Sequence, residues 1–137
     1  MSSVDVYRWL EHTAELGLLI EAASDEDVFR EALAAFTELI GDGDTREGDR
    51  LDVPVALRAA TVADLLVAWL EELVFLADTE QLVPDAAQEL RLEPGELRAI
   101  VRGRRGAPRP IVKAVTYHGL EFVREGGRSR AHVVLDV

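Results

Sequence analysis

The sequence contains no cysteine, and this absence excludes several classes of protein at once. Disulfide-stabilised scaffolds, zinc sites with cysteine ligands, iron–sulfur clusters and thiol catalysis all require cysteine side chains. No apolar run approaches the roughly 20 residues of a membrane-spanning helix, and the first residues lack the basic and apolar regions of a signal peptide. We therefore expect a cytoplasmic protein that does not bind membranes.

Basic residues are scarce relative to acidic ones. The 137 residues include 15 Lys and Arg against 26 Asp and Glu, which gives a formal net charge of −11. Proteins that bind nucleic acid unaided usually carry net positive charge, because their affinity comes from neutralising phosphates. The acidic majority suits a basic protein partner, a hard metal cation or simple solubility. Apolar residues make up 48% of the chain, enough for the core of one domain over residues 1–137.

The few basic residues concentrate near the end of the sequence. Residues 98–137 contain nine basic and three acidic side chains, and no acid lies between Leu97 and Leu120. Two interpretations stay open for the run Arg98–Lys113. It could bind RNA, or its arginines could pair with acids of residues 1–97 and balance charge within the fold.

Two helices are predicted from apolar residues at helical spacing. Ser24 and Thr61 are each followed three residues later by aspartate, a spacing typical of helix N-terminal caps. The first helix is expected to begin at Ser24 and to stop at Gly41. The second is expected over about Val62–Ala77, with a wide apolar face that indicates the central core helix.

Strands are predicted before, between and after these helices. Pro54 lies in an alternating segment and should place its strand at a sheet edge or bulge. The order β-β-α-β-α followed by a β-rich half indicates a single α+β domain, with two helices packed on a mixed or antiparallel sheet. The expected strands are Val4–Leu10, Gly17–Ala22, Leu51–Leu57, Leu90–Leu92, Leu97–Arg102, Ile111–Val123 and Ala131–Val137.

Familiar catalytic and metal-binding motifs are missing from the sequence. The acidic loop that begins at Asp42 lacks the glycine and final glutamate of a calcium-binding loop, with Glu47 and Val53 at those positions. The histidines are too far apart for a helical zinc motif, and there is no P-loop, GxSxG or GxGxxG. On residue chemistry alone, an independent enzyme is not supported.

Two segments combine unusual residues. Glu11–Gly17 places two carboxylates, an imidazole and a hydroxyl between two expected strands. Val133–Val137 ends an apolar strand with Asp136 and then a terminal carboxylate, two acids that repel unless solvent or a cation separates them. Residue types alone favour a polar loop and a frayed end.

Four motifs together resemble the archease family. The segment HTAELG at residues 12–17 resembles the family signature HTADIG, and LLVAWLEELVFLADTE at residues 65–80 resembles the helix LLVxWLNELLYLxDTE. The segment KAVTYHGL at residues 113–120 is similar to the strand KAVTYHxL, and the Leu-Asp-Val ending also fits. The matches follow the family's order and extend over nearly the whole chain.

The resemblance implies a non-catalytic accessory protein in tRNA splicing. Archease activates an RtcB-type RNA ligase by promoting guanylylation of a ligase histidine and by supporting multiple turnover. GTP and RNA would then be contacted only through the ligase. The resemblance also implies a divalent cation, calcium or magnesium or manganese, held by acidic residues. Its ligands would be Glu15, Asp136 and Val137, the last through backbone or terminal oxygens, with His12, Lys113 and His118 as supporting groups.

Two positions depart from the family pattern. Glu15 stands where aspartate is usual, and its extra methylene lengthens the reach of the carboxylate; Glu71 stands where asparagine is common. Tyr117, in the third motif, is expected to pack in the core. The alternatives to an activator are a stand-alone metal-dependent phosphoester or nucleotide hydrolase, and a chaperone-like or RNA-binding module that uses Arg98–Lys113. The activator hypothesis requires folding to bring Glu15 and the Asp136–Val137 end together.

Overall fold

The computed structural model describes residues 5–12, 14–41 and 49–137, apart from the side chains of Glu11 and His12. The elements follow the order β-β-α-β-α-β-β-β-β, so the predicted α+β class is confirmed. They are β1 (Val6–His12), β2 (Glu15–Ala22), α1 (Asp25–Ile40), β3 (Arg50–Arg58), α2 (Val62–Glu80), β4 (Leu82–Glu93), β5 (Glu96–Arg105), β6 (Ala114–Glu125) and β7 (Arg128–Asp136).

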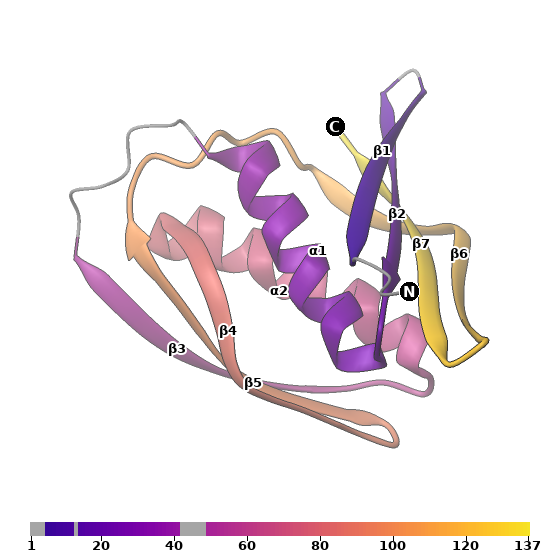
Figure 1. Cartoon of the computed structure of the whole chain (residues 1–137). Helices are drawn as coiled ribbons and strands as arrows, with labels where there is room; N and C mark the ends of the chain where they lie inside the picture. The colour runs from indigo at the N-terminus through magenta and orange to yellow at the C-terminus, as the bar shows by residue number, and fades with distance from the viewer. Residues whose placement is uncertain (1–4, 13, 42–48) are drawn as a thin grey trace.

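The strands form two antiparallel sheets with the helices between them (Figure 1). Sheet A has the order β1-β2-β7-β6, and sheet B has the order β3-β5-β4. Helix α1 contacts β2 and β4, while α2 contacts β6, β4 and β3, so each helix touches both sheets. Each sheet therefore turns one face toward the helices and one outer face away from them. Pro54 lies in β3, at an edge of sheet B, as predicted.

Both helices begin at the predicted caps. The Ser24 hydroxyl accepts a hydrogen bond from the backbone N–H of Asp27 at 3.1 Å, and the Thr61 hydroxyl accepts one from Asp64 at 3.1 Å. These bonds satisfy N–H groups that the first helical turn leaves without partners. Helix α1 ends before Gly41, as its sequence predicts. None of the helices within the described ranges is long and apolar enough to cross a membrane.

The core lies between the sheets and is centred on α2. Trp69 is fully buried, and its indole N–H donates to the carbonyl of Phe29 at 2.9 Å. The two rings also meet edge to face, with their centroids 6.4 Å apart. Burying an indole costs free energy unless its N–H has a partner, and this bond supplies one while connecting α2 to α1.

Two expectations about the C-terminal half need correction. Strand β4 begins at Leu82 and includes Pro84, whereas the sequence indicated only Leu90–Leu92. Tyr117, expected in the core, is 63% exposed, because β6 shifts register between Thr116 and Glu121. Residues 42–48, which carry most of the loop compared with a calcium site, lie outside the described residues.

Candidate functional site

Glu15 and Asp136 lie directly opposite each other on neighbouring strands of sheet A. Side chains opposite each other in an antiparallel pair project from the same face, with Cβ atoms about 5 Å apart. Leu18, three residues after Glu15 on β2, and Leu135, next to Asp136 on β7, are fully buried on the helix side. Because strand residues alternate between faces, Glu15 and Asp136 belong to the outer face, where both side chains are partly exposed. The fold therefore places Glu15 and Asp136 opposite each other on one face of the sheet.

Backbone hydrogen bonds hold the end of β7 on both sides. The N–H of Val137 donates to the carbonyl of Ala14 at 3.1 Å, and the N–H of Lys113 donates to the carbonyl of Asp136 at 2.8 Å. Ala14 adopts a left-handed backbone conformation with φ of 61°, which is uncommon for a residue with a Cβ. This turn places Glu15 at the start of β2, beside Asp136.

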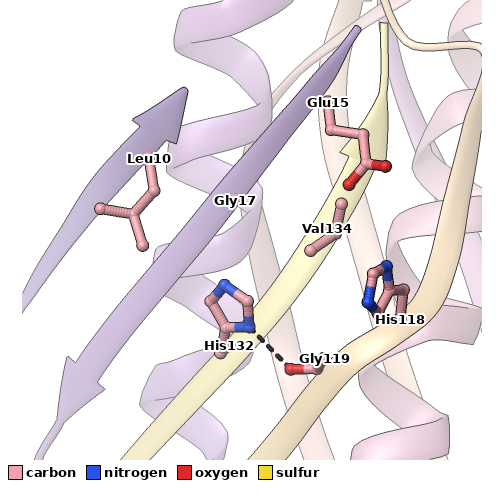
Figure 2. Close-up of a pocket in the computed structure, with 7 residues that line it drawn as sticks. All are labelled: Leu10, Glu15, Gly17, His118, Gly119, His132 and Val134. Carbon is pink, nitrogen blue, oxygen red and sulfur yellow. Dashed lines mark hydrogen bonds between the residues drawn. The ribbon is translucent and has the colours of Figure 1, made fainter. Parts of the chain in front are cut away.

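A pocket of about 500 Å³ opens on the same outer face. Figure 2 shows the Glu15 carboxylate and two imidazole rings over strands β2, β7 and β6. Four of the lining residues are glycine or apolar: Leu10, Gly17, Gly119 and Val134. The lining residues are Leu10, Glu15, Gly17, His118, Gly119, His132 and Val134.

His132 joins β7 to the irregular part of β6. Its Nδ1 lies 2.7 Å from the carbonyl oxygen of Gly119. Because a carbonyl only accepts hydrogen bonds, Nδ1 carries the proton and Nε2 of the neutral ring presents a lone pair. A Cβ on Gly17 would lie 3.1 Å from Nε2, and a Cβ on Gly119 would lie 3.3 Å from Cε1. The ring therefore fits between two glycines.

His132 was not among the site residues predicted from the sequence. One available signal was its alternation with Val134 and Asp136 along the last strand, which places all three on one face. The contact between His132 and Gly119 could not be predicted, because it depends on the register shift in β6 that turns Gly119 toward the His132 ring. Register depends on strand pairing, and the residues of β6 alone do not reveal it.

The supporting residues named from the sequence lie in different places. His118 lines the pocket together with Glu15, and its backbone N–H donates to the Thr116 hydroxyl at 3.1 Å. The backbone of His12 pairs with Glu15, while its side chain lies outside the described residues. Lys113 is exposed and lines a separate hollow between β6 and α2, beside Phe75.

The donor set can be compared with what metal ions need. Within the described ranges, no group of three or more His, Cys, Asp or Glu side chains is arranged to hold a metal. Glu15 and Asp136 supply carboxylate oxygens, which suit calcium or magnesium better than zinc. Magnesium is often held by one or two carboxylates and several waters. The two residues therefore fit a hard cation whose remaining ligands come from backbone oxygens, water or a partner.

The basic run is largely used within the fold, which favours internal charge balance over an RNA surface. Arg109 closes the end of α1: its N–H donates to the carbonyl of Ile40 at 2.8 Å, and its guanidinium donates to the carbonyl of Leu39 at 2.9 Å. A cation at a helix C-terminus also interacts favourably with the helix dipole. Three more arginines pair with acids of residues 1–97: Arg102 with Asp52 at 3.0 Å, Arg104 with Asp85 at 3.7 Å and Arg105 with Glu80 at 3.7 Å.

Known proteins provide an independent comparison. The model of the Archease protein family matches residues 7–137. Protein archease of Methanosarcina mazei is 34% identical over 96% of this chain and 95% of its own length. Protein archease of Methanopyrus kandleri is 35% identical over 93% of this chain and 96% of its own length.

Two solved structures share the fold. The solution structure of protein 1598 from Methanobacterium thermoautotrophicum has a TM-score of 0.71 and 26% identity, covering 96% of this chain and 98% of that one. The crystal structure of an archease from Thermotoga maritima, described as a possible chaperone, has a TM-score of 0.68 and 25% identity. It covers 93% of this chain and 94% of that one. The family model and the full-length relatives agree with the motifs and the fold, and this chain belongs to the archease family.

Proposed function

We propose that this protein activates an RtcB-type RNA ligase by presenting a divalent cation on the outer face of sheet A. Glu15 and Asp136 hold the cation, and Val137 contributes backbone or terminal oxygens. The cation supplies positive charge that helps to arrange GTP during guanylylation of the ligase histidine. The observation that carries this proposal is the direct opposition of Glu15 and Asp136 at the end of β2 and β7.

The open character of the site supports an accessory role. Two like charges opposite each other on a sheet destabilise the fold, and a bound cation removes that repulsion. Two carboxylates leave several coordination positions of calcium or magnesium unfilled. A partner can therefore share the ion without first displacing protein ligands from a closed shell.

The imidazoles beside the carboxylates contribute to the shape of the site. His132 uses Nδ1 to hold the carbonyl of Gly119, which fixes the segment of β6 that carries His118. That segment forms one wall of the pocket next to Glu15. Groups that fix the surroundings of a metal ligand often influence its affinity, because they limit the orientations that the ligand can adopt.

Guanylylation of the cognate ligase is the direct test. The transfer of radiolabelled GMP from GTP to the ligase is measured with and without this protein, in magnesium, manganese and calcium. Acceleration is expected with the wild-type protein. If guanylylation is equally fast without it under every metal condition, the activator function is wrong.

Two substitutions connect activation with the carboxylates. Asp136→Asn keeps the shape of the side chain but removes its charge, so stimulation should be lost while the fold remains. Glu21→Gln is the matched control, since Glu21 lies on the same face of β2 but pairs in register with Arg130. Stimulation retained by Asp136→Asn, or lost equally in Glu21→Gln, would remove Asp136 from the site. Glu15→Asp, which preserves the charge, should retain stimulation.

A further inference from the structure

The outer face of sheet B carries a pair of arginines in an unusual position. Arg91 on β4 and Arg98 on β5 are register partners, and both are exposed. Like charges directly opposite each other in a sheet are destabilising. Neither guanidinium has a hydrogen-bond or ion-pair partner among the residues that the structure describes.

A second pair of arginines on this sheet provides a comparison, because a carboxylate lies between its two guanidiniums. Arg50 and Arg104 are also register partners, on β3 and β5. Between them lies the carboxylate of Asp85, 3.0 Å from the Arg50 guanidinium and 3.7 Å from that of Arg104. At that end of the sheet the protein itself supplies the bridging anion, whereas no described carboxylate bridges Arg91 and Arg98.

Two acids on this face already have other arginine partners. Glu96 pairs with Arg58 at 2.8 Å, and Asp52 pairs with Arg102 at 3.0 Å. Glu89 lines the same hollow as Arg91 and Arg98 without an ion pair to either among the described residues. Its charge therefore opposes an incoming anion without neutralising the arginines through a direct contact.

The arginines border a hollow of about 380 Å³ with an apolar side. Pro54 and Ala56 on β3 and Ile100 on β5 line it beside Arg98. The volume lies at the small end of the roughly 300–1,000 Å³ range typical of ligand pockets. A ligand with a compact anionic end and an uncharged organic part suits this hollow, because the anionic end can lie at the arginines and the organic part against the apolar residues.

We propose that Arg91 and Arg98 form a binding site for the phosphate of a nucleotide monophosphate, whose nucleoside lies against Pro54, Ala56 and Ile100. A phosphomonoester carries nearly two negative charges at pH 7, so it can neutralise both guanidiniums, whereas a carboxylate or a phosphodiester carries one. Each guanidinium presents a planar fork of donors that matches phosphate oxygens. The net charge of −11 disfavours a long polyanion on this face.

This inference goes beyond the proposed activation of a ligase and involves another part of the molecule. The helices separate the outer face of sheet B from the outer face of sheet A that carries Glu15 and Asp136 (Figure 1). Binding is therefore measured on the protein alone, without metal or ligase. Failure of one proposal leaves the other intact.

The experiment follows backbone amide shifts in NMR titrations at low salt with uridine 5′-monophosphate. Changes are expected in the β4 and β5 amides around Arg91 and Arg98. The cyclic nucleotide diester and inorganic phosphate should bind several-fold more weakly, since the first has one charge and the second lacks the nucleoside. Equal binding of inorganic phosphate, or tighter binding of phosphoserine or oligoglutamate, would overturn the assignment to a nucleotide.

Paired variants separate the site from general surface charge. Arg91→Gln/Arg98→Gln should weaken nucleotide binding about tenfold or more, because it removes the charge-assisted hydrogen bonds to phosphate. Arg58→Gln is the control on the same face and should change affinity less than about twofold, since its guanidinium is engaged by Glu96. Glu89→Gln should strengthen binding. Equal losses in the control and the double variant, or no nucleotide-induced shifts in the wild type, would refute the site.

Discussion

Each of the two sheets carries, on its outer face, a pair of like charges directly opposite each other that no described residue of opposite charge bridges, and the two pairs have opposite signs. Sheet A opposes Glu15 with Asp136, while sheet B opposes Arg91 with Arg98. Other positions on sheet B bring unlike charges together: Asp52 pairs with Arg102, and Arg58 pairs with Glu96. Unlike charges opposite each other on neighbouring strands stabilise the fold, whereas like charges destabilise it. At the two like-charged pairs, we propose that a ligand of the opposite charge removes this repulsion.

The sheets also differ in how an edge strand departs from regular pairing. In sheet A, β6 shifts register after Thr116, and the His132 side chain occupies the space beside Gly119. In sheet B, β4 shifts register after Pro84, and the backbone of β4 rests directly against Gly103 of β5. A side chain can move to accommodate a new methyl group more easily than a backbone can. Replacing a glycine by alanine should therefore destabilise sheet B more than sheet A.

The largest expected effect tests the backbone contact in sheet B. A Cβ on Gly103 would lie 2.3 Å from the Val83 carbonyl oxygen and 2.8 Å from the Pro84 Cα. Gly103→Ala should therefore lower the free energy of unfolding by about 3 kcal/mol, because strand backbones must separate. Urea unfolding followed by circular dichroism measures the change. A loss below about 1 kcal/mol would mean that β4 moves readily.

The second effect concerns the carboxylate pair of sheet A. Asp136→Asn should weaken calcium binding by about tenfold or more, because it removes the charge of one of the two side chains proposed as ligands. Isothermal titration calorimetry of the isolated protein measures the affinity. The same titration on Glu21→Gln provides the reference, and an equal reduction there would indicate general electrostatic attraction instead of a defined site.

A smaller effect is expected where a side chain occupies the space in sheet A. A Cβ on Gly17 would lie 3.1 Å from His132 Nε2 and 3.2 Å from the Leu10 Cβ. Gly17→Ala should cost about 1 kcal/mol of unfolding free energy, since the imidazole can shift. NMR of the histidine ring should show a changed environment. If Gly17→Ala is as destabilising as Gly103→Ala, the contrast between the two sheets is wrong.

The smallest expected effects are the changes in stability when one carboxylate is neutralised, and they should have opposite signs on α1 and on sheet B. Burial, and then the carboxylates of Asp5 and Asp27, raise the pKa of Glu31 on α1. A raised carboxyl pKa favours the fold at low pH, and this contribution is lost as the pH rises through the raised value. Glu31→Gln should therefore increase stability at pH 7 by a few tenths of a kcal/mol, and the gain should vanish at low pH.

On sheet B, neutralising a carboxylate should lower the stability of the fold. Asp52→Asn removes the partner of the Arg102 guanidinium and should lower stability by about 0.5 kcal/mol or less, as expected for an exposed ion pair. Thermal unfolding of both variants at low and high salt measures the two changes. A stabilising Asp52→Asn, or a destabilising Glu31→Gln at neutral pH, would contradict the distinction between balanced and unbalanced charges.

Local features of the fold were predictable from the sequence, because they depend on neighbouring residues. The Ser24 and Thr61 caps follow from side chains that reach only three residues along the chain. The start of β4 was missed because Pro84 is unusual in a strand, and the exposed position of Tyr117 follows from the register shift in β6. Both depend on pairing with distant segments, for which local patterns carry little information.

The candidate site was predictable only through the motifs. Residue types alone favoured a polar loop around Glu15 and a frayed end at Asp136. Their proximity results from β2 pairing with β7, two strands separated by most of the chain. No periodicity within either strand specifies that partner. The family resemblance supplied the connection, and the strand register gives it a physical basis.

The position of β7 in sheet A has a consequence for synthesis. This strand lies between β2 and β6 and follows every other described element in sequence. The β1–β2 hairpin therefore cannot pair with it until residues 128–136 have left the ribosome. Such distant pairing slows folding, because a long segment must be ordered before the contact forms. A nascent chain can thus assemble sheet B around the helices early, while the face bearing Glu15 is completed only after translation has passed Asp136.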